Sequence, residues 1–146
     1  MIVVADASVL VGELLHQRGR ALIAHPNLHV AVAEHQWGET QYELRRRLGI
    51  LSGKGRISEE SRAELEDAIS GLVGAKAIEI IAHDAYAHLE PVARRRVPRD
   101  PNDWPTVALA LLLDVGILTG DYDFLGCGCP TWTVDTLLAE LAGNTK

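Results

Sequence analysis

The chain has 146 residues, a length that fits one domain with a buried core. Hydrophobic residues make up 47% and charged residues 23% of it, which is ordinary for a globular protein, and no stretch reaches the roughly eighteen uncharged apolar residues of a membrane helix. The net charge of −6 argues against indiscriminate binding to nucleic acid. Because the N-terminus has no basic start, it does not resemble a signal peptide. We therefore expect a single cytoplasmic domain over residues 1–146.

The first third of the chain begins with two short apolar, β-branched runs. Residues 2–5 and 28–32 predict buried strands. Between them the pattern predicts one helix from about 8 to 24, weakened in its middle by Gly19, and Pro26 then breaks the chain.

Two helices are predicted next. The segment from Glu34 to Arg47 has apolar residues at near-helical spacing, and Gly49 marks its end. Ser58 has the residue type and position of an N-cap for the following helix, which Gly71 and Gly74 close.

The second half repeats the alternation of strand and helix. Residues 77–81 predict a third strand, and a helix capped by Asp84 runs towards residue 96, with Pro91 expected to kink or divide it. An apolar helix over 105–115 and a short strand over 117–119 follow.

The chain closes with a strand over 131–134 and a helix over 136–141 that Asp135 would cap. Alternating strands and helices indicate an α/β fold with a mainly parallel sheet. Ligands of open α/β sheets lie beyond the carboxyl ends of the strands. Asp6 follows the first strand and Asp121 follows the fourth, so both are predicted to stand on that edge.

Acidic residues recur at the predicted edge. Asp103 and Asp121 are separated by 18 positions (121 − 103), enough for a loop, a helix and a returning strand. Carboxylates brought together repel each other unless a cation lies between them, and ligand sets made of oxygen alone suit Mg²⁺ or Mn²⁺. Such an ion can activate water and neutralise charge on a phosphodiester. The candidate acids are Asp6, Glu39, Asp100, Asp103, Asp121 and Asp123.

Each acid also has a structural interpretation. Asp6 and Asp103 can be helix N-caps, and Asp100 can be a turn residue. Glu39 can be a solvated helix residue, and the segment from 121 to 123 looks like an Asx-rich turn. The functional interpretation is favoured because three independent segments place an acid where the fold would gather them.

Other kinds of site lack their patterns. The sequence has no Gly-x-x-x-x-Gly-Lys-Ser/Thr loop, no Gly-x-Gly-x-x-Gly after a strand and no Gly-x-Ser-x-Gly. Cys127 and Cys129 are too close together for an ordinary disulfide and too few for a structural zinc site.

Four stretches together resemble the PIN domain, a family of small metal-dependent nucleases that includes the VapC-type toxins. Residues 3–8 (Val-Val-Ala-Asp-Ala-Ser) resemble its first strand, which ends in Asp-x-Ser. Glu39 resembles the family's helical glutamate, and Asp103 resembles the third acid, before an Ala/Leu-rich helix. Residues 119–124 (Thr-Gly-Asp-Tyr-Asp-Phe) resemble the stretch Thr-x-Asp-x-Asp-Phe. The segments 99–105 and 124–132 are untypical of the toxin branch and suggest a subgroup of PIN-domain proteins.

The resemblance implies a three-layer sandwich with a central parallel sheet and helices on both faces. It implies four catalytic metal ligands, Asp6, Glu39, Asp103 and Asp121. It implies supporting roles for Ser8, Asp100, Thr119 and Asp123. Which glutamate belongs to the site remains open, because Glu34, Glu39 and Glu43 lie on one predicted helix. Glu39 is chosen from its distance in sequence to Leu44-Arg45-Arg46.

The resulting hypothesis is that the protein is an Mg²⁺- or Mn²⁺-dependent endoribonuclease that does not associate with membranes. It could be the toxin of a toxin–antitoxin pair, and its partner would then be an antitoxin protein. The candidates for contacts to the RNA backbone are Arg45, Arg46, Arg95 and Arg99. A homodimer could use Trp37, Tyr42 and Leu48, although core packing explains those residues equally well. The alternatives are a catalytically silent module that binds nucleic acid or nucleotides, and an interaction subunit whose acids only cap helices.

Overall fold

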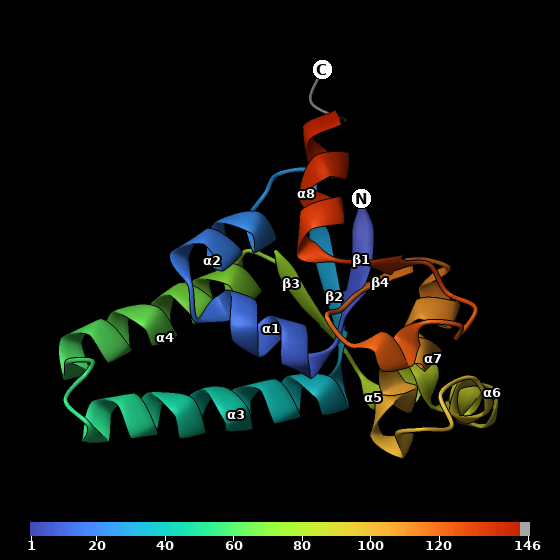
Figure 1. Ribbon diagram of the computed structural model, residues 1–146, viewed down its shortest axis with the longest axis horizontal. Coiled ribbons are helices and arrows are strands. Elements are labelled where there is room, and N and C mark those ends of the chain that lie inside the picture. The colour runs from blue at the N-terminus through green and yellow to red at the C-terminus, as the bar shows by residue number, and fades with distance from the viewer. Residues whose placement is uncertain (144–146) are drawn as a thin grey trace.

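A five-stranded parallel sheet forms the centre of the protein in a computed structural model that describes residues 1–143 (Figure 1). Its strands are β1 (Ile2–Ala5), β2 (His29–Ala33), β3 (Ile78–Ile81), β4 (Gly116–Leu118) and β5 (Thr131–Trp132). The order across the sheet is β3-β2-β1-β4-β5, and all four neighbouring pairs are parallel. The first strand is therefore central, with β2 on one side and β4 on the other.

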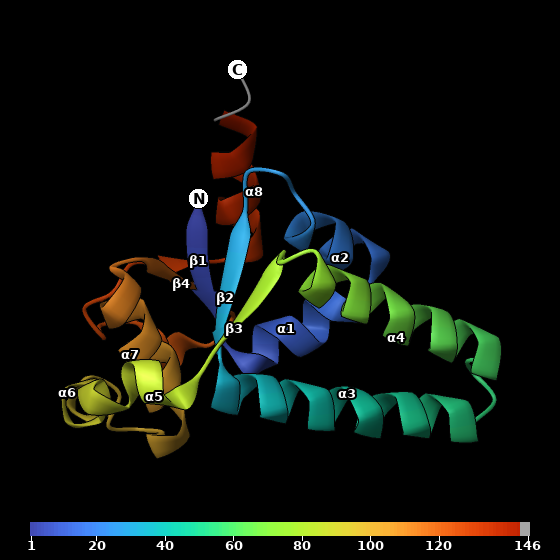
Figure 2. The ribbon, with the colours of Figure 1, turned by 180° about the vertical axis from the view of Figure 1, so that it is seen from behind.

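Helices cover both faces of this sheet (Figures 1 and 2). Successive strand residues point to opposite faces, so Val3 and Ala5 belong to one hydrophobic core and Val4 to the other. The first core is completed by α1 (Ala7–Leu14), α2 (Gln17–Ile23), α3 (Glu34–Gly53), α4 (Glu59–Gly74) and α8 (Val134–Gly143). The second is completed by α5 (His83–Tyr86), α6 (Glu90–Arg96) and α7 (Trp104–Leu113). The predicted three-layer α/β sandwich is confirmed.

The apolar helix of the second half is α7, and it lies against β1 and β2. Residues 104–110 are buried without interruption, as a helix that is apolar all round requires. It ends at Asp114, whose φ of 54° gives a left-handed C-cap. The returning strand β4 follows. The helix predicted over 105–115 and the strand predicted over 117–119 are therefore confirmed, with bounds shifted by one or two residues.

The single helix predicted over 8–24 is wrong. The segment forms two helices that meet at a corner, where His16 has an extended backbone. A Cβ on Gly19 would lie 2.1 Å from the carbonyl oxygen of Glu13, so α2 can approach the end of α1 this closely only with glycine there. Gly19 therefore marks a close contact between two helices rather than a weak point within one.

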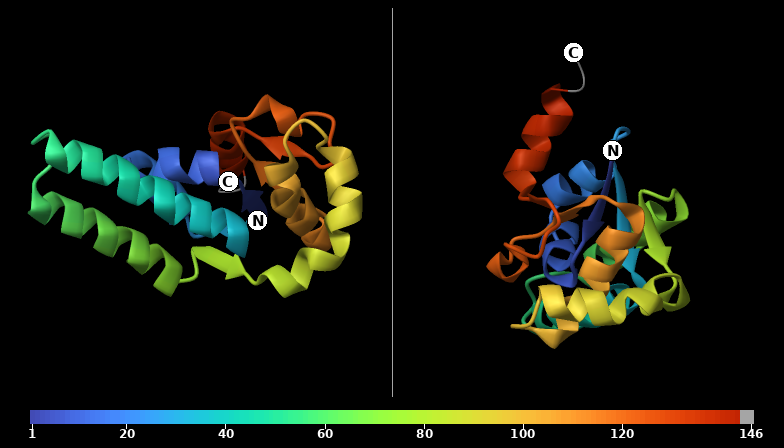
Figure 3. Two further views of the ribbon diagram at one scale, coloured as in Figure 1. Left: turned by 90° about the horizontal axis from the view of Figure 1, so that it is seen from below. Right: turned by 90° about the vertical axis from the view of Figure 1, so that its right-hand side faces the viewer.

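The end predicted for α3 at Gly49 is also wrong, because the helix continues to Gly53. A glycine inside a helix costs only about 1 kcal/mol, and the burial of Leu48 one residue earlier offsets it. Beyond the sheet α3 runs antiparallel to α4, and the pair projects to one side (Figure 3). Ser58 caps α4 as predicted, its Oγ accepting the N–H of Ser61 at 3.1 Å.

The helix predicted over residues 84–96 is divided, as the presence of Pro91 led us to expect. A short 3₁₀ turn (Ala87–Leu89) separates α5 from α6, and Pro91 lies in the first turn of α6. The two caps predicted here and at the end of the chain are wrong. Ala82 precedes α5 in place of Asp84, and in α8 the first-turn N–H of Thr136 bonds Thr133 Oγ1 at 3.1 Å instead of Asp135. Within residues 1–143, no helix combines the length and apolar character needed to span a membrane.

Candidate metal centre

The carboxyl ends of β1 and β4 lie side by side at the middle of the sheet. After β1 the chain continues towards β2 on one side, and β4 flanks it on the other, so the strand order reverses at this point. A crevice opens at such a reversal in α/β folds, and it is where their ligands bind. Asp6 directly follows β1, and Asp121 follows β4 by three positions (121 − 118).

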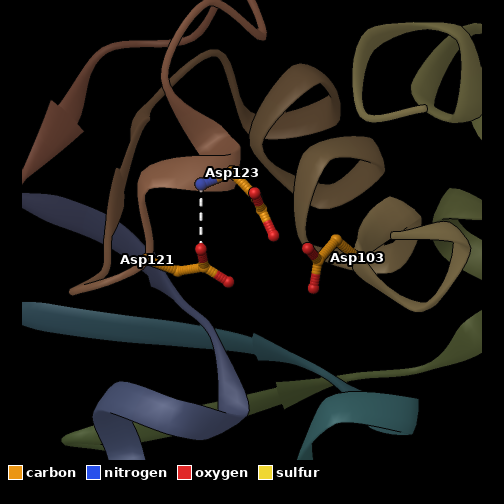
Figure 4. A group of neighbouring side chains, drawn as sticks. All are labelled: Asp103, Asp121 and Asp123. Carbon is orange, nitrogen blue, oxygen red and sulfur yellow. Dashed lines mark hydrogen bonds between the residues drawn. The ribbon is translucent and has the colours of Figure 1, made fainter. Parts of the chain in front are cut away.

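Three carboxylates converge beside this crevice. Each of Asp103, Asp121 and Asp123 offers an oxygen within 4.8 Å of the other two, and their side chains point towards one another in Figure 4. We call these three residues the acid cluster. Asp103 ends the 3₁₀ turn before α7 (Pro101–Asp103), whereas the other two flank Tyr122 in the turn after β4. Residues predicted to converge across 18 positions therefore do so, and Asp123, expected only to support the site, lies within the cluster.

The turn that carries Asp121 and Asp123 is fixed by three interactions. Asp121 Oδ1 accepts the N–H of Asp123 at 2.8 Å (dashed in Figure 4), the Asx turn predicted for this segment. Thr119 Oγ1 accepts the N–H of Asp121 at 2.9 Å, and Phe124 is fully buried below. The structural and functional interpretations of these acids are therefore compatible.

Asp6 is held from two sides and is 4% exposed. Its Oδ1 caps α1 by accepting the N–H of Val9 at 2.8 Å, and its Oδ2 accepts the hydroxyl of Thr119 at 2.5 Å. Burial raises the pKa of Asp6; the bonds from Thr119 and Val9 oppose that rise, and the charge of Asp121 adds to it. Thr119 thus joins the acid after β1 to the acid after β4.

Asp103 is the least satisfied member of the cluster. It begins α7 without capping it, and its Oδ2 is buried with no hydrogen-bond partner among residues 1–143. Burial raises the pKa of Asp103 to about 7, and the charges of Asp100, Asp121, Asp6 and Asp123 contribute in that order. A buried acceptor without a donor is rare and costly, and a cation beside it would remove both the missing contact and the repulsion. This donor set, made of carboxylate oxygens, fits a hard divalent ion.

The buried amide of Gln36 braces the centre, and the sequence analysis missed it. Gln36 Oε1 accepts the N–H of Ala7 at 3.1 Å, and Nε2 donates to the carbonyl of Asn102 at 3.0 Å. One side chain, 3% exposed in the first turn of α3, therefore ties the residue after Asp6 to the residue before Asp103. A signal was present, because α3 starts at the same edge of the sheet and a glutamine beside the buried Trp37 needs polar partners.

The three glutamates of α3 have different neighbours. Glu34 accepts the N–H of His83 at 3.1 Å, and Glu43 accepts bonds from Arg46 and Arg47, which lower the pKa of Glu43 to about 2. Glu39 lies outside the acid cluster, with its Oε1 3.2 Å from Nε2 of His35. All three line an open hollow of about 680 Å³ between α1 and α3, here called the glutamate hollow, which also reaches Ser8.

The remaining predicted residues lie around the centre. Ser8 is exposed and lines the hollows on both sides of the crevice. Asp100 Oδ1 accepts the N–H of Asn102 at 2.9 Å, which shapes the loop before Asp103. Among the predicted RNA-binding arginines, Arg46 is tied to Glu43, whereas Arg99 lines a hollow that also contains Asp123. The other two, Arg45 and Arg95, are exposed on α3 and α6.

A parallel sheet with aspartates gathered at its carboxyl edge defines an acidic α/β centre of the kind found in metal-dependent nucleases. The chain belongs to the PIN domain family, whose pattern matches residues 4–142. Members of this family are generally nucleases and typically bind divalent metal ions. A search among curated proteins finds no match.

Two solved structures share the fold at low sequence identity. PAE2754 from Pyrobaculum aerophilum has a TM-score of 0.64 and 17% identity, covering 98% of this chain and 96% of its own. VapBC2 from Rickettsia felis, bound to a DNA fragment from its promoter, has a TM-score of 0.60 and 14% identity, covering 91% and 98%. At these identities the likeness concerns the fold.

Proposed function

We propose that this protein is a divalent-cation-dependent ribonuclease that hydrolyses RNA phosphodiester bonds, with Mg²⁺ or Mn²⁺ held by Asp6, Glu39, Asp103 and Asp121 and with Asp123 in support. The observation that carries the proposal is the buried Oδ2 of Asp103, which has no hydrogen-bond partner in the described part of the chain, on a side chain that lies beside carboxylates from a remote segment. Membership of the PIN domain family supports the same reaction class. When bound, the ion supplies a water of lowered pKa and neutralises charge on the phosphoryl oxygens.

The chain itself contributes orientation and proton control. Thr119 and the N–H of Val9 hold both oxygens of Asp6, so this carboxylate cannot rotate away from the crevice. The turn at 121–123 fixes two more carboxylates without support from long side chains. Asp103, with a pKa of about 7, carries its proton for part of the time at neutral pH and releases it when a cation binds.

Glu39 remains the proposed glutamate of the set. Glu34 is bonded to the backbone at His83 and Glu43 to two arginines, so both are engaged away from the crevice. Glu39 lies 3.2 Å from Nε2 of His35, forms no ion pair with an arginine or lysine within residues 1–143, and shares the glutamate hollow with Ser8. The proposed set is therefore Asp6, Glu39, Asp103 and Asp121, with Asp123 in direct support.

The test is cleavage of a panel of labelled structured RNAs with Mn²⁺ and with chelator. The parent protein should cut with Mn²⁺ only. Asp121→Asn should lose at least about 100-fold in rate, because a ligand of the ion is removed. Asp67→Asn, an exposed acid on α4, is the matched control and should keep the parent rate. Equal cleavage by the parent and Asp121→Asn would refute the proposal, and binding without cleavage would favour the silent nucleic-acid- or nucleotide-binding module.

A second proposal concerns the biological setting, namely a toxin silenced by an antitoxin. Its support is the shared fold with VapBC2 and the glutamate hollow, whose carboxylates suit a basic side chain from a partner. Expression of the parent protein should then arrest growth, and Asp121→Asn should not.

A homodimer is also only proposed. Trp37 and Leu48 are buried in the chain's own core, so Tyr42, 69% exposed, is the member of the predicted interface set that a second copy can reach. Sedimentation of the parent protein and Tyr42→Ala would test this.

A further inference from the structure

Tyr122 is an aromatic residue exposed beside the acid cluster. It is 82% exposed, although burial of a tyrosine ring is normally favourable. Its two neighbours in sequence, Asp121 and Asp123, both belong to the cluster. In the sequence, Tyr122 therefore lies directly between two acids of the proposed reaction centre.

The turn leaves Tyr122 no other orientation. The bond from the N–H of Asp123 to Asp121 closes the turn on one side, and the N–H of Leu125 bonds the carbonyl of Tyr122 at 3.0 Å on the other. Phe124 is fully buried and anchors the turn to the core. Aspartates directed into the cluster and a phenylalanine directed into the core leave the tyrosine directed outward on a fixed backbone.

Hollows lie on both sides of the ring. One, of about 580 Å³, reaches back past Asp121 to the first turn of α1, where Ser8 lies. The other, of about 410 Å³, is here called the arginine hollow, and it is lined by Arg96, Pro98, Arg99, Tyr122, Asp123 and Leu125. Tyr122 and Asp123 line both hollows, so a strand bound along them would pass the exposed ring of Tyr122 next to the acid cluster.

The arginine hollow combines two arginines and one acid, Asp123, with apolar surface. Arg96 is anchored, its Nη1 donating to the carbonyl of Cys127 at 3.1 Å, and Gly128 leaves the room it occupies. Arg99 is exposed and, within residues 1–143, forms no salt bridge. Leu125, 61% exposed, and Pro98 supply apolar contacts next to these charges. A guanidinium beside an exposed aromatic ring is the pairing that binds a phosphate and its base together.

We propose that Tyr122 stacks an unpaired base of a single-stranded RNA while Arg99 binds the adjoining phosphate, so that the strand is led from the arginine hollow to the acid cluster. The inference rests on the proposed ribonuclease function and assigns two residues that would hold its substrate beside the acid cluster. Stacking on one exposed ring needs a base that is free of its pairing partner, so loops and single strands are bound and continuous duplexes are not. Since every base offers a flat face, the subsite sets little sequence preference.

Charge decides between this ring and the other exposed tyrosine near the centre. Tyr42 lies in the glutamate hollow with Glu34, Glu39 and Glu43. The arginine of that hollow, Arg47, is already 3.2 Å from Glu43. Three acids face one arginine there, so a phosphate would be repelled, whereas two arginines face the single acid Asp123 in the arginine hollow, which favours a phosphate.

The experiment measures binding by fluorescence anisotropy in chelator, so that no cleavage occurs. The probes are a short single-stranded RNA and an abasic strand with the same sugar-phosphate backbone. Tyr122→Ala should weaken binding of the RNA roughly 5- to 150-fold and leave the abasic strand unchanged. Tyr122→Phe keeps a ring and should stay within about twofold of the parent. Arg99→Gln should weaken both probes, and Tyr42→Ala is the matched control and should weaken neither.

Two results would overturn the inference. One is equal RNA binding by the parent and Tyr122→Ala; the other is an equal loss of binding for the RNA and the abasic strand, which would mean that the ring does not touch a base. Thermal melting of each variant checks folding, and Tyr122→Ala should melt like the parent because its ring is exposed. Failure of the ribonuclease proposal is separate: it would appear as no Mn²⁺-dependent cleavage by the parent, whatever the binding data show.

Discussion

The brace formed by Gln36 gives the sharpest test of how the centre is assembled. Gln36→Met keeps the side-chain length and removes both polar atoms. Ala7 then loses the acceptor of its N–H, and Asn102 loses the donor to its carbonyl. An unsatisfied buried group costs about 1–3 kcal/mol, but Asn102 is exposed and Ala7 is half-buried, so water replaces part of each bond. We expect a loss of about 1–3 kcal/mol, or roughly 3–9 °C in Tm for a domain of this size.

The effect on the metal site should exceed the effect on stability. The two bonded groups lie next to Asp6 and Asp103 in sequence, so loss of the brace frees both acid-bearing segments to move. Removing a group that orients metal ligands typically lowers metal affinity about 10- to 100-fold. Calorimetric titration with Mn²⁺ measures this directly. Thermal melting checks it, because a ligand at about 100 times its Kd stabilises the native state by about 2.7 kcal/mol.

The control for this test lies one turn further along α3. Thr40 is also fully buried, and its hydroxyl bonds only the local carbonyl of Gln36 at 2.7 Å. Thr40→Val should lower Tm modestly and keep the Mn²⁺ affinity of the parent. The reasoning is refuted if Gln36→Met binds Mn²⁺ as tightly as the parent, or if Thr40→Val loses as much affinity.

Three further predictions concern single residues. In chelator, the free energy of unfolding should fall as pH rises from about 4 to 7, because the folded state keeps a proton on Asp103 that the unfolded chain has released. After allowance for solvent screening the part due to Asp103 is on the order of 1–2 kcal/mol, and urea titrations should show a fall that is smaller by this amount in Asp103→Asn, where buried Asp6 still contributes. Thr119→Val removes the donor to Asp6 and should lower Mn²⁺ affinity about 10- to 100-fold; an unchanged titration curve would contradict the role given to that hydroxyl. Gly19→Ala should destabilise by about 1–3 kcal/mol through its clash with Glu13, measured by urea against Gly12→Ala, which meets open space.

The sequence predicted most elements because their patterns are local. Strands β1, β2 and β3 are short apolar runs, and α7 is apolar on all sides. The composition of each of these segments is therefore enough to predict that it is buried. Besides the two misplaced caps, the errors arose where a glycine was interpreted by its propensity alone. Gly49 lies inside α3, which continues past it because neighbouring side chains are buried. Gly19 lies inside α2, and glycine is needed there because the end of α1 approaches it closely.

The acids of the centre were also predicted in part. Asp6, Asp103 and Asp121 lie at element ends that can be recognised in sequence, whereas the strand order that brings them together came from the tertiary structure. Three-dimensional distance alone raised Asp123 from a supporting acid to a member of the cluster. The three-dimensional structure also places Glu39 next to His35 and outside the acid cluster. The sequence could not predict this, because the position of a residue along a helix does not tell which neighbouring group its side chain contacts.

By itself, then, the sequence determined the parallel sheet, its acidic edge and the family resemblance, since these depend on residue types at the ends of apolar runs. Tertiary structure alone decided how those acids are held. Gln36 bonds residues 29 and 66 positions away, and no local pattern carries such separations. The pKa of Asp103 likewise depends on burial and on charges from remote segments, which exist only after the chain has folded.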